Sequence, residues 1–273
     1  MNYYRLLTIA GSDSGGGAGI QADLKTFSAL GCYGMSVICA LTAQNTQAVT
    51  GIYPVSPEFI TMQIDAIMED IGVDAVKIGM LHSPEVIIAV TERLKHYQAP
   101  NIVVDPVMVS TGGDKLLQDD AVDALRTLLF PIADVITPNL PEAAILLNQP
   151  VETLLSADRA QLEIACRNLS AFGAKAVVLK GGHSHSGMVL DLLYTAGEGR
   201  LKSFESKRID TPNTHGTGCT LSSAIAAHLA KGHPLEEAVL QSKIYITGAL
   251  KAGAAYQVGN GHGPVHHFYR YWQ

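Results

Sequence analysis

Short apolar runs alternate with stretches of helical period along almost the whole chain, and this alternation limits the possible folds more than any other feature. The first unit shows the pattern: residues 6–10 are a continuous apolar run, glycines crowd positions 11–19, and apolar residues recur at helical spacing over 20–30. A buried strand, a glycine-rich loop and an amphipathic helix in this order open a βαβ unit. Repetition of such units predicts an α/β fold whose mostly parallel sheet carries helices on both faces.

The remaining units follow the same two periods. No internal repeat, linker or low-complexity tract interrupts them, so residues 1–273 are predicted to fold as a single domain. A β-hairpin is predicted where two strand-like runs flank Gly197 and Gly199. Further strands are expected at 35–41, 49–55, 75–78, 102–104, 135–136, 176–179, 189–194 and 201–207, and further helices at 57–68, 84–97, 121–129, 141–147, 160–172, 219–230 and 235–254.

Composition excludes several classes of partner. The formal net charge is -6 and no long run of Lys and Arg occurs, so nothing resembles the basic footprint of a nucleic-acid-binding protein. No stretch approaches the ~20 apolar residues of a membrane span, and the apolar run at the N-terminus is too short for a signal peptide. The four cysteines lack CxxC spacing, which favours free thiols in a reducing compartment. We therefore expect a soluble cytoplasmic protein.

Polar and glycine-rich residues follow most of the predicted parallel strands, at the end of each strand. In open parallel sheets, ligands bind beyond the carboxyl ends of the strands, where such residues meet. This convergence predicts one ligand site and is more informative than any single motif. The residues concerned are 11–19, Gln44, Gly79, Met80, Asp105, Asn139, Glu142, Lys180 and 214–219.

The most informative of these segments is NTHGTGCT at 213–220, which opens a helix of small residues. A helix N-terminus presents unpaired N–H groups and the positive end of a dipole, so it receives anions well. Gly216 and Gly218 allow a ligand to approach the backbone, and Cys219 lies in the first turn, where the dipole stabilises a thiolate. The alternative is an ordinary helix start, with one of the threonines as the N-cap and Cys219 as a packed thiol.

Two nucleotide-binding motifs can be tested directly. The P-loop pattern GxxxxGK[ST] does not occur in the sequence. Residues 17–22 match the dinucleotide pattern GxGxxA, but that fold needs an acidic residue about 20 positions further on, where this chain has Gln44 and Asn45. An NAD-dependent oxidoreductase is therefore disfavoured.

The remaining residues suit phosphoryl transfer. This chemistry needs positive charge or N–H groups around the moving phosphoryl group, a metal ligand, and a group that receives the proton of the acceptor. Lys180 follows an apolar strand, which disfavours a solvated surface role, and Asp105 and Glu142 can hold Mg²⁺ directly or through water. Two alternatives stay open: Glu142 can serve only the helix dipole, and Asp105 with Pro106 can form only a turn.

The histidines do not indicate a metal site. His183 with His185, and His266 with His267, lack further ligands at useful spacing, so we expect them to be loop and tail residues. His215 lies inside the glycine-rich segment and can be a structural hydrogen-bonding residue.

Eight stretches, taken in order along the chain, resemble one known family. They are AGSDSGGGAGIQADLK at 10–25, TAQNT at 42–46, KIGML at 77–81, DPVM at 105–108, TPNLPEA at 137–143, KGGH at 180–183, NTHGTGCT at 213–220 and GPVHH at 263–267. Together they resemble the bacterial hydroxymethylpyrimidine/phosphomethylpyrimidine kinases of thiamine biosynthesis, in the ribokinase-like superfamily. The resemblance covers essentially the whole chain, and the motifs are highly specific in combination.

This resemblance implies a ribokinase-like fold, a doubly wound sheet with helices on both faces, and usually a homodimer. It implies two successive phosphorylations that use ATP and Mg²⁺. The first makes the monophosphate of 4-amino-5-hydroxymethyl-2-methylpyrimidine, and the second makes the diphosphate that supplies the pyrimidine half of thiamine. The alternatives are a pyridoxal or pyridoxine kinase of the same fold and a catalytically inactive sensor that binds the pyrimidine.

The resemblance also implies roles for the residues at the strand ends. Gln44 would hydrogen-bond the pyrimidine edge, since one carboxamide matches a donor beside an acceptor. Lys180 and Glu142 would serve ATP and Mg²⁺. The other residues implied are Gly11, Asp23, Met80 and Val107 around the ring, Asp105, Asn139 and Thr217 near ATP, with Asp105 also near the metal, and Gly216, Gly218 and Cys219 at the anion hole for the moving phosphoryl group.

Cys219 departs from the wider superfamily, which usually has Asp at this position, and follows its subgroup. The helix dipole should lower the pKa of the thiol, whereas nearby phosphates should raise it. We hypothesise that Cys219 receives the hydroxymethyl proton. The glycines of 11–19 and of 106–115 would also allow either loop to close over a ligand.

Overall fold

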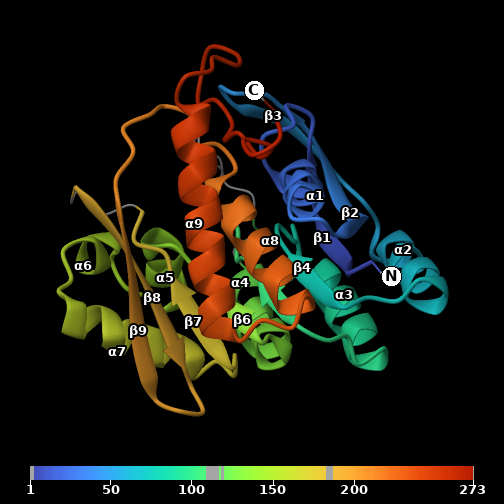
Figure 1. The fold of residues 1–273 in the computed structure, drawn as a ribbon. Helices are drawn as coiled ribbons and strands as arrows, with labels where there is room; N and C mark the ends of the chain where they lie inside the picture. The colour runs from blue at the N-terminus through green and yellow to red at the C-terminus, as the bar shows by residue number, and fades with distance from the viewer. Residues whose placement is uncertain (1–2, 109–116, 118–119, 183–186, 273) are drawn as a thin grey trace.

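A nine-stranded sheet forms the centre of the structure, a computed structural model that describes residues 3–108, 117, 120–182 and 187–272 (Figure 1). Every strand expected from the apolar runs is present. In chain order the strands are β1 (Arg5–Asp13), β2 (Tyr33–Gln44), β3 (Val49–Pro54), β4 (Ala75–Ile78), β5 (Ile102–Val104), β6 (Val135–Ile136), β7 (Ala176–Leu179), β8 (Met188–Thr195) and β9 (Arg200–Lys207).

The chain winds outward in both directions from β1. The strand order is β3-β2-β1-β4-β5-β6-β7-β8-β9, so β1 lies between β2 and β4. β1 is parallel to both neighbours, and parallel pairing continues through β5 and β6 to β7. The outer strands are antiparallel, β3 to β2 on one side and β8 to β7 and β9 on the other. This order confirms the doubly wound, mostly parallel α/β fold.

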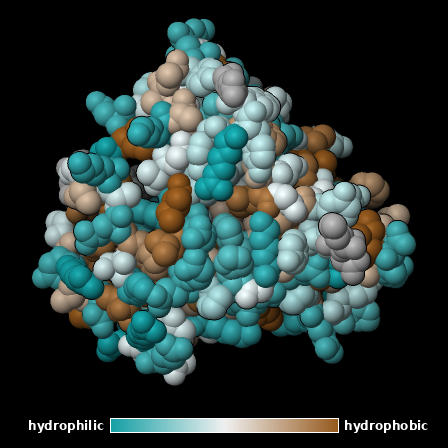
Figure 2. All heavy atoms as spheres, in the orientation of Figure 1, coloured by the Kyte–Doolittle hydropathy of each residue, from teal (hydrophilic) through white to brown (hydrophobic). Residues whose placement is uncertain are grey.

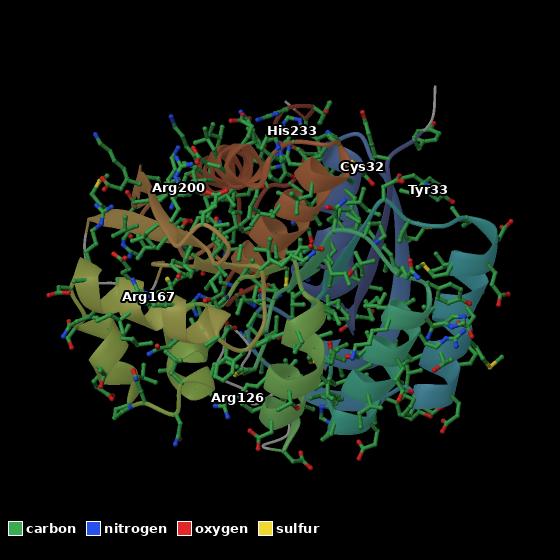
Figure 3. All side chains as sticks on the ribbon, turned by 90° about the horizontal axis from the view of Figure 1, so that it is seen from below. Cys32, Tyr33, Arg126, Arg167, Arg200 and His233 are labelled. Atoms are coloured by element: carbon green, nitrogen blue, oxygen red, sulfur yellow. The ribbon has the colours of Figure 1, made fainter. Side chains whose placement is uncertain are left out.

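Helices cover both faces of the sheet. Figure 3 shows the layers from below, with His233 beside the helices of one layer and Arg126 on those of the other. One face carries α1 (Gly19–Ala29), α8 (Thr217–Ala230) and α9 (Leu235–Gly253). The other carries α2 (Pro57–Asp70), α3 (Pro84–His96), α4 (Ala121–Ala124), the π-helix η1 (Leu125–Leu129), the 3-10 turn η2 (Phe130–Ile132), α5 (Leu140–Leu146), α6 (Val151–Leu155) and α7 (Arg159–Ser170).

The strands β1 and β4 to β8 supply both cores, because successive side chains of a strand point to opposite faces. In β1, Leu7 joins the core under α2 and α3, whereas Leu6 joins the core under α1 and α8. Burying one such side chain contributes about 1.5–3 kcal/mol. In β4, Val76 and Ile78 also face the first core, so the residue between them, Lys77, points toward the second. A charged side chain there needs a partner.

Two helical predictions differ from the structure. The helix α6 was not expected, because its five residues are too few to show a helical period. The helix expected over 121–129 is instead α4 followed by η1, whose bonding is of the wider π type. The hairpin around Gly197 and Gly199 is confirmed as β8 and β9.

The surface shown in Figure 2 has apolar side chains interspersed among hydrophilic ones. Within the described ranges, no helix combines the length and apolar composition needed to cross a membrane. Two expectations lie outside these ranges: the loop roles of His183 and His185, and closure of the segment 106–115, most of which falls in 109–116.

Candidate active site

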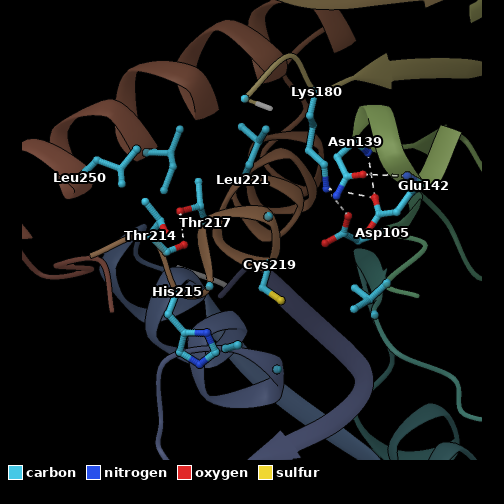
Figure 4. A pocket seen from close by; sticks show the side chains of 18 of the residues that line it. Asp105, Asn139, Glu142, Lys180, Thr214, His215, Thr217, Cys219, Leu221 and Leu250 are labelled. Carbon is cyan, nitrogen blue, oxygen red and sulfur yellow. Dashed lines mark hydrogen bonds and ion pairs between the residues drawn. The ribbon is translucent and has the colours of Figure 1, made fainter. Parts of the chain in front are cut away.

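A cavity of about 520 Å³ opens at the carboxyl ends of the parallel strands. Its walls come from those strand ends, from the glycine-rich loop after β1, and from the first turns of α5 and α8 (Figure 4). The polar residues that follow the strands therefore meet, as the sequence predicts. All the predicted site residues except Asp23 line it: Gly11, Gln44, Met80, Asp105, Val107, Asn139, Glu142, Lys180, Gly216, Thr217, Gly218 and Cys219.

Lys180 joins two carboxylates on one wall. Its Nζ lies 2.7 Å from Asp105 Oδ1 and 3.8 Å from Glu142 Oε2. Thr137 Oγ1 donates to Asp105 Oδ1 at 2.9 Å, and Ser222 Oγ donates to Asp105 Oδ2 at 3.3 Å. The two carboxylates are buried around a single ammonium, so the cluster carries excess negative charge when both are ionised.

Burial and mutual charge separate the two carboxyl groups. Burial raises the pKa of Glu142 to about 7; the Lys180 ammonium opposes this shift and the Asp105 carboxylate adds to it. Burial also acts to raise the pKa of Asp105, but Lys180 and Lys77 outweigh it and hold that pKa below its ordinary value. Asp105 is therefore the ionised partner at neutral pH, and Glu142 is the group that takes up a proton first.

The first turn of α5 holds Glu142 in place. Asn139 is the N-cap, and its Oδ1 accepts from Glu142 N at 2.8 Å while Glu142 Oε2 accepts from Asn139 N at 2.8 Å. This is a complete capping box. The helix-start role of Glu142 is thus confirmed, and the same carboxylate also faces Lys180.

The first turn of α8 lies beside this cluster. Its N-cap is Gly216, with φ +79° and no side-chain cap, so neither threonine caps the helix. Thr217 Oγ1 donates instead to Thr214 O at 2.6 Å. A Cβ built on Gly218 would lie 3.2 Å from Lys180 Nζ. The leading N–H groups of α8 and the lysine therefore converge, as an anion site requires.

Cys219 is half-buried between these features; in Figure 4 it lies between the Lys180 group and His215. Burial raises the pKa of the thiol to about 11, and the nearby Lys77 ammonium limits this increase. The thiol pKa is therefore raised rather than lowered, and the thiol is protonated at neutral pH.

Asp23 lies beneath the cavity rather than in its wall. Its carboxylate is fully buried, 2.9 Å from Lys77 Nζ, and it accepts from Thr8 Oγ1 and Ser223 Oγ, each at 2.6 Å. Burial alone would lower the pKa of Lys77, but Asp23 and other nearby anions raise it above its ordinary value. Lys77 remains an ammonium next to the floor of the cavity, and Asp23 acts on the site through it.

Gln44 ends β2 at the other side of the cavity. Thr42 Oγ1 donates to its Oε1 at 3.0 Å. Ser14 Oγ donates to Gln44 O at 2.7 Å and accepts from Gln44 N at 2.8 Å. The backbone of Gln44 is therefore tied to the glycine-rich loop after β1. Met80 packs on the last part of β1, since a Cβ on Gly11 would meet Met80 Cε at 2.7 Å.

Comparison with known proteins identifies the family. Residues 13–266 match the family model described as phosphomethylpyrimidine kinase. The chain belongs to the phosphomethylpyrimidine kinase family. A hydroxymethylpyrimidine/phosphomethylpyrimidine kinase from Rhizobium meliloti is 51% identical over 267 residues, which cover 98% of each protein.

Two solved structures confirm the ribokinase-like fold of this family member. The phosphomethylpyrimidine kinase of Clostridium difficile has a TM-score of 0.78 and 44% identity, over 90% of this chain and 99% of that one. An ADP complex of Bacillus subtilis pyridoxal kinase has a TM-score of 0.87 and 39% identity, over 97% of this chain and 98% of that one.

Sequence reasoning missed the apolar end of the cavity in this kinase. Ile209, Leu221, Ile246 and Leu250 line it, the last three from α8 and α9. Their spacing along the helices is that of ordinary core residues, so no local signal separates them from the core.

The sequence analysis also did not predict two buried ion pairs. Lys77 pairs with Asp23, and Lys243 Nζ pairs with Asp191 Oδ2 at 2.5 Å. Asp191 Oδ1 also accepts from Gly181 N at 2.8 Å, which holds the turn directly after the Lys180 strand end. A signal did exist, because Lys77 and Asp191 are single charges inside otherwise apolar strands.

Proposed function

We propose that this cavity transfers the terminal phosphoryl group of ATP to 4-amino-5-hydroxymethyl-2-methylpyrimidine, and then to the resulting monophosphate. The diphosphate so formed is the pyrimidine half of thiamine. One observation carries the proposal: the Lys180, Asp105 and Glu142 cluster lies against the first turn of α8, and both line a single cavity together with Cys219. The Lys180 ammonium, the leading N–H groups of α8 and the Cys219 thiol thus surround the place where a phosphoryl group would move, as phosphoryl transfer requires. Membership of the family supports the same substrate class.

The acceptor belongs at the end of the cavity that Gln44 lines. An aminopyrimidine edge presents a donor beside an acceptor, and the Gln44 carboxamide supplies the complementary pair. Gly11, Met80 and Val107 provide apolar surface for the flat ring at the same end. The hydroxymethyl group would then point toward Cys219 and the α8 turn.

The nucleotide belongs at the opposite end. Lys180, Asn139, Asp105 and Thr217 lie where its phosphates would meet the α8 turn, and the apolar residues on α8 and α9 offer surface for the base. The leading N–H groups of α8, together with Gly216 and Gly218, would hold the moving phosphoryl group.

The donor set fits Mg²⁺. Glu142 and Asp105 are buried carboxylates that share one ammonium, and Mg²⁺ is usually bound by one or two carboxylates together with substrate phosphates. Bound there, the ion would neutralise charge on the phosphate oxygens. Glu142 must be ionised to contribute, which its raised pKa makes dependent on pH near neutrality.

The role of Cys219 as proton acceptor carries a condition. A thiol whose pKa is about 11 is almost entirely protonated at neutral pH, so it must lose its proton before it can accept another. The Lys77 ammonium is the buried cation that favours this ionisation. General-base help of this kind typically contributes ~10²–10⁴ in rate.

Product analysis tests the function. The enzyme is incubated with ATP and Mg²⁺ and with hydroxymethylpyrimidine, pyridoxine or pyridoxal in separate reactions, and the products are resolved by chromatography. We expect monophosphate and then diphosphate from the pyrimidine. Phosphorylation of the pyridine substrates alone would overturn the acceptor, and the Bacillus subtilis pyridoxal kinase neighbour makes this arm informative. Absence of ADP in every reaction would favour the alternative of a catalytically inactive sensor that binds the pyrimidine.

Variants in the same assay test the residues. Cys219→Ala should lose turnover strongly and Cys219→Asp should restore part of it, whereas near-native turnover of Cys219→Ala would refute the proton-acceptor role.

Gln44→Ala should weaken acceptor binding by about 1–3 kcal/mol, since a buried hydrogen-bond partner is lost. Lys180→Met should lower turnover on both acceptors.

We further infer the setting of the enzyme. All four cysteines are free, three of them buried, which supports a reducing compartment such as the cytoplasm. One sheet runs from β3 to β9, which supports a single kinase domain over 1–273. The exposed apolar side chains of β2, β3 and α2 support a homodimer.

A further inference from the structure

One carboxylate, that of Asp13, is the junction between the two glycine-rich loops of the cavity. Its Oδ1 accepts from Gly15 N at 2.7 Å, and its Oδ2 accepts from Gly17 N at 3.0 Å and Ala18 N at 2.8 Å. Oδ2 also lies 2.8 Å from His215 Nε2. Asp13 and His215 are 202 positions apart in sequence and only 3% and 7% exposed.

The chemistry of these contacts defines the roles of the two side chains. Burial acts to raise the pKa of Asp13, but His215 and the loop N–H groups outweigh it and hold that pKa below its ordinary value. An ionised carboxylate only accepts hydrogen bonds, so His215 Nε2 must carry the proton and donate it. Every contact of the junction is therefore directed from a loop to the same carboxylate.

The two loops touch as closely as glycine allows. A Cβ on Gly17 would lie 2.3 Å from His215 Cδ2, and a Cβ on Gly216 would lie 1.9 Å from Gly17 O. Gly216 adopts φ +79° as the N-cap of α8. On its far side, His215 N donates to Gly263 O at 3.0 Å, so the histidine is held through both its ring and its backbone.

Each loop serves a different reactant in the proposed function. The Asp13 loop includes Ser14, whose hydroxyl holds both the N–H and the C=O of Gln44. The His215 loop runs directly into Gly216 and the α8 turn. The junction therefore connects the residue proposed to hold the acceptor with the turn proposed to hold the moving phosphoryl group.

We propose that Asp13 and His215 are positioning residues that set the separation of the acceptor from the phosphoryl group, and that they contribute little to the binding of either substrate alone. This inference rests on the proposed function. A misplacement of about 1 Å between reacting groups can cost about 10² in rate. Loss of the pair should therefore lower turnover and increase the amount of ADP formed per phosphorylated product.

The test uses His215→Ala in the complete enzyme, with His215→Gln as the conservative variant because its amide can still donate to Asp13. For His215→Ala we expect kcat to fall about 10²-fold, KM for ATP and for the pyrimidine to stay near those of the parent enzyme, and more ADP to form per product. His215→Gln should recover much of kcat, and added imidazole should recover part of it in His215→Ala. His96→Ala, exposed on α3 outside the cavity lining, is the matched control and should behave as the parent enzyme.

A second variant checks that the two residues act together. Asp13→Asn keeps the size of the side chain but loses acceptors, and the double variant Asp13→Asn/His215→Ala should lose no more kcat than the worse single variant. Native kcat in His215→Ala, additive losses in the double variant, or a loss confined to KM would each overturn the inference. If His215→Ala does not fold, the amount of ADP formed per phosphorylated product in His215→Gln decides. A lowered kcat with the same ADP-to-product ratio as the parent enzyme would overturn the inference. A parent enzyme inactive on the pyrimidine would instead reject the proposed function.

Discussion

The charge state of Cys219 depends on two fully buried charged residues, Lys77 and Asp23. Lys77 Nζ lies 2.9 Å from Asp23 Oδ2, and both side chains are fully buried beneath the thiol. Lys77 lowers the pKa of Cys219, whereas Asp23 raises it. Fields of this kind act strongly because little water screens them. The buried pair thus sets how readily the thiolate forms.

Alkylation of Cys219 by iodoacetamide tests this directly. Only the thiolate reacts, so with a pKa near 11 the rate should rise about tenfold per pH unit from pH 7 to 9 without a plateau. Lys77→Met removes the cation, raises the pKa further and should slow the reaction at each pH. Asp23→Asn leaves Lys77 un-neutralised, lowers the pKa and should speed the reaction. Peptide mapping separates Cys219 from the three buried thiols.

Folding of these variants needs its own control. Lys77→Met leaves a carboxylate buried without its cation, a change that typically costs 3–5 kcal/mol. The double variant Lys77→Met/Asp23→Asn removes both charges and keeps an amide that can accept from one of the two hydroxyls, Thr8 or Ser223, and donate to the other. Equal alkylation rates in all variants would contradict the electrostatic account.

At the scale of elements, α5 and α7 begin with the same device in different places. The α5 capping box joins Asn139 and Glu142 inside the cavity wall, and the α7 capping box joins Asp158 and Gln161 on the exposed surface. Both satisfy N–H groups that a helix start leaves free. Only the α5 capping box also holds a carboxylate next to Lys180. Loss of either box should therefore lower stability, but only loss of the α5 box should lower activity.

Asn139→Ala and Asp158→Ala test this separation. Each loses an N-cap, so each should lower the free energy of unfolding by about 1 kcal/mol in urea titrations. Asn139→Ala alone should lower kcat and raise the Mg²⁺ concentration needed for half-maximal rate, because Glu142 loses its tether. Retained activity in Asn139→Ala, or a matching loss in Asp158→Ala, would show that the cap serves only the helix.

At the scale of the whole molecule, exposed apolar side chains gather on β2, β3 and the start of α2. Leu41 and Tyr53 are cross-strand partners, 46% and 71% exposed, and Phe59 and Met62 on α2 are 55% and 63% exposed. β3 is also an edge strand of the sheet. Clustered apolar groups beside a sheet edge are typical of protein–protein contacts. This supports the proposed homodimer.

Tyr53→Glu places a charge in that cluster. If a second copy covers it, the variant should shift from dimer to monomer in size-exclusion chromatography with light scattering, at the same protein concentration. Ile164→Glu is the matched control, since Ile164 is an apolar residue 55% exposed on α7, and it should leave the assembly unchanged. A parent protein that is monomeric, or a dimeric Tyr53→Glu, would contradict the prediction.

Local patterns in the sequence predicted most of the helices and strands and the place of the site. Strand and helix periods are local properties, so β1, its glycine loop and α1 follow from residues within a short window. The direction of parallel strands then brings Gln44, Asp105 and Lys180 to one edge, which is why their meeting was predictable. A helix as short as α6 has too few residues for any period to appear.

The pairing and the charge of the site residues depend on the tertiary structure. Asp23 lies below the cavity because its partner Lys77 comes from β4, 54 positions away. Gly216 rather than a threonine caps α8 because the backbone of Gly17 occupies the space that a side chain would need. The thiol of Cys219 has a raised pKa because burial outweighs the nearby Lys77 ammonium. Burial, close contact and buried charge depend on segments distant in sequence, and no local pattern records which of them will meet.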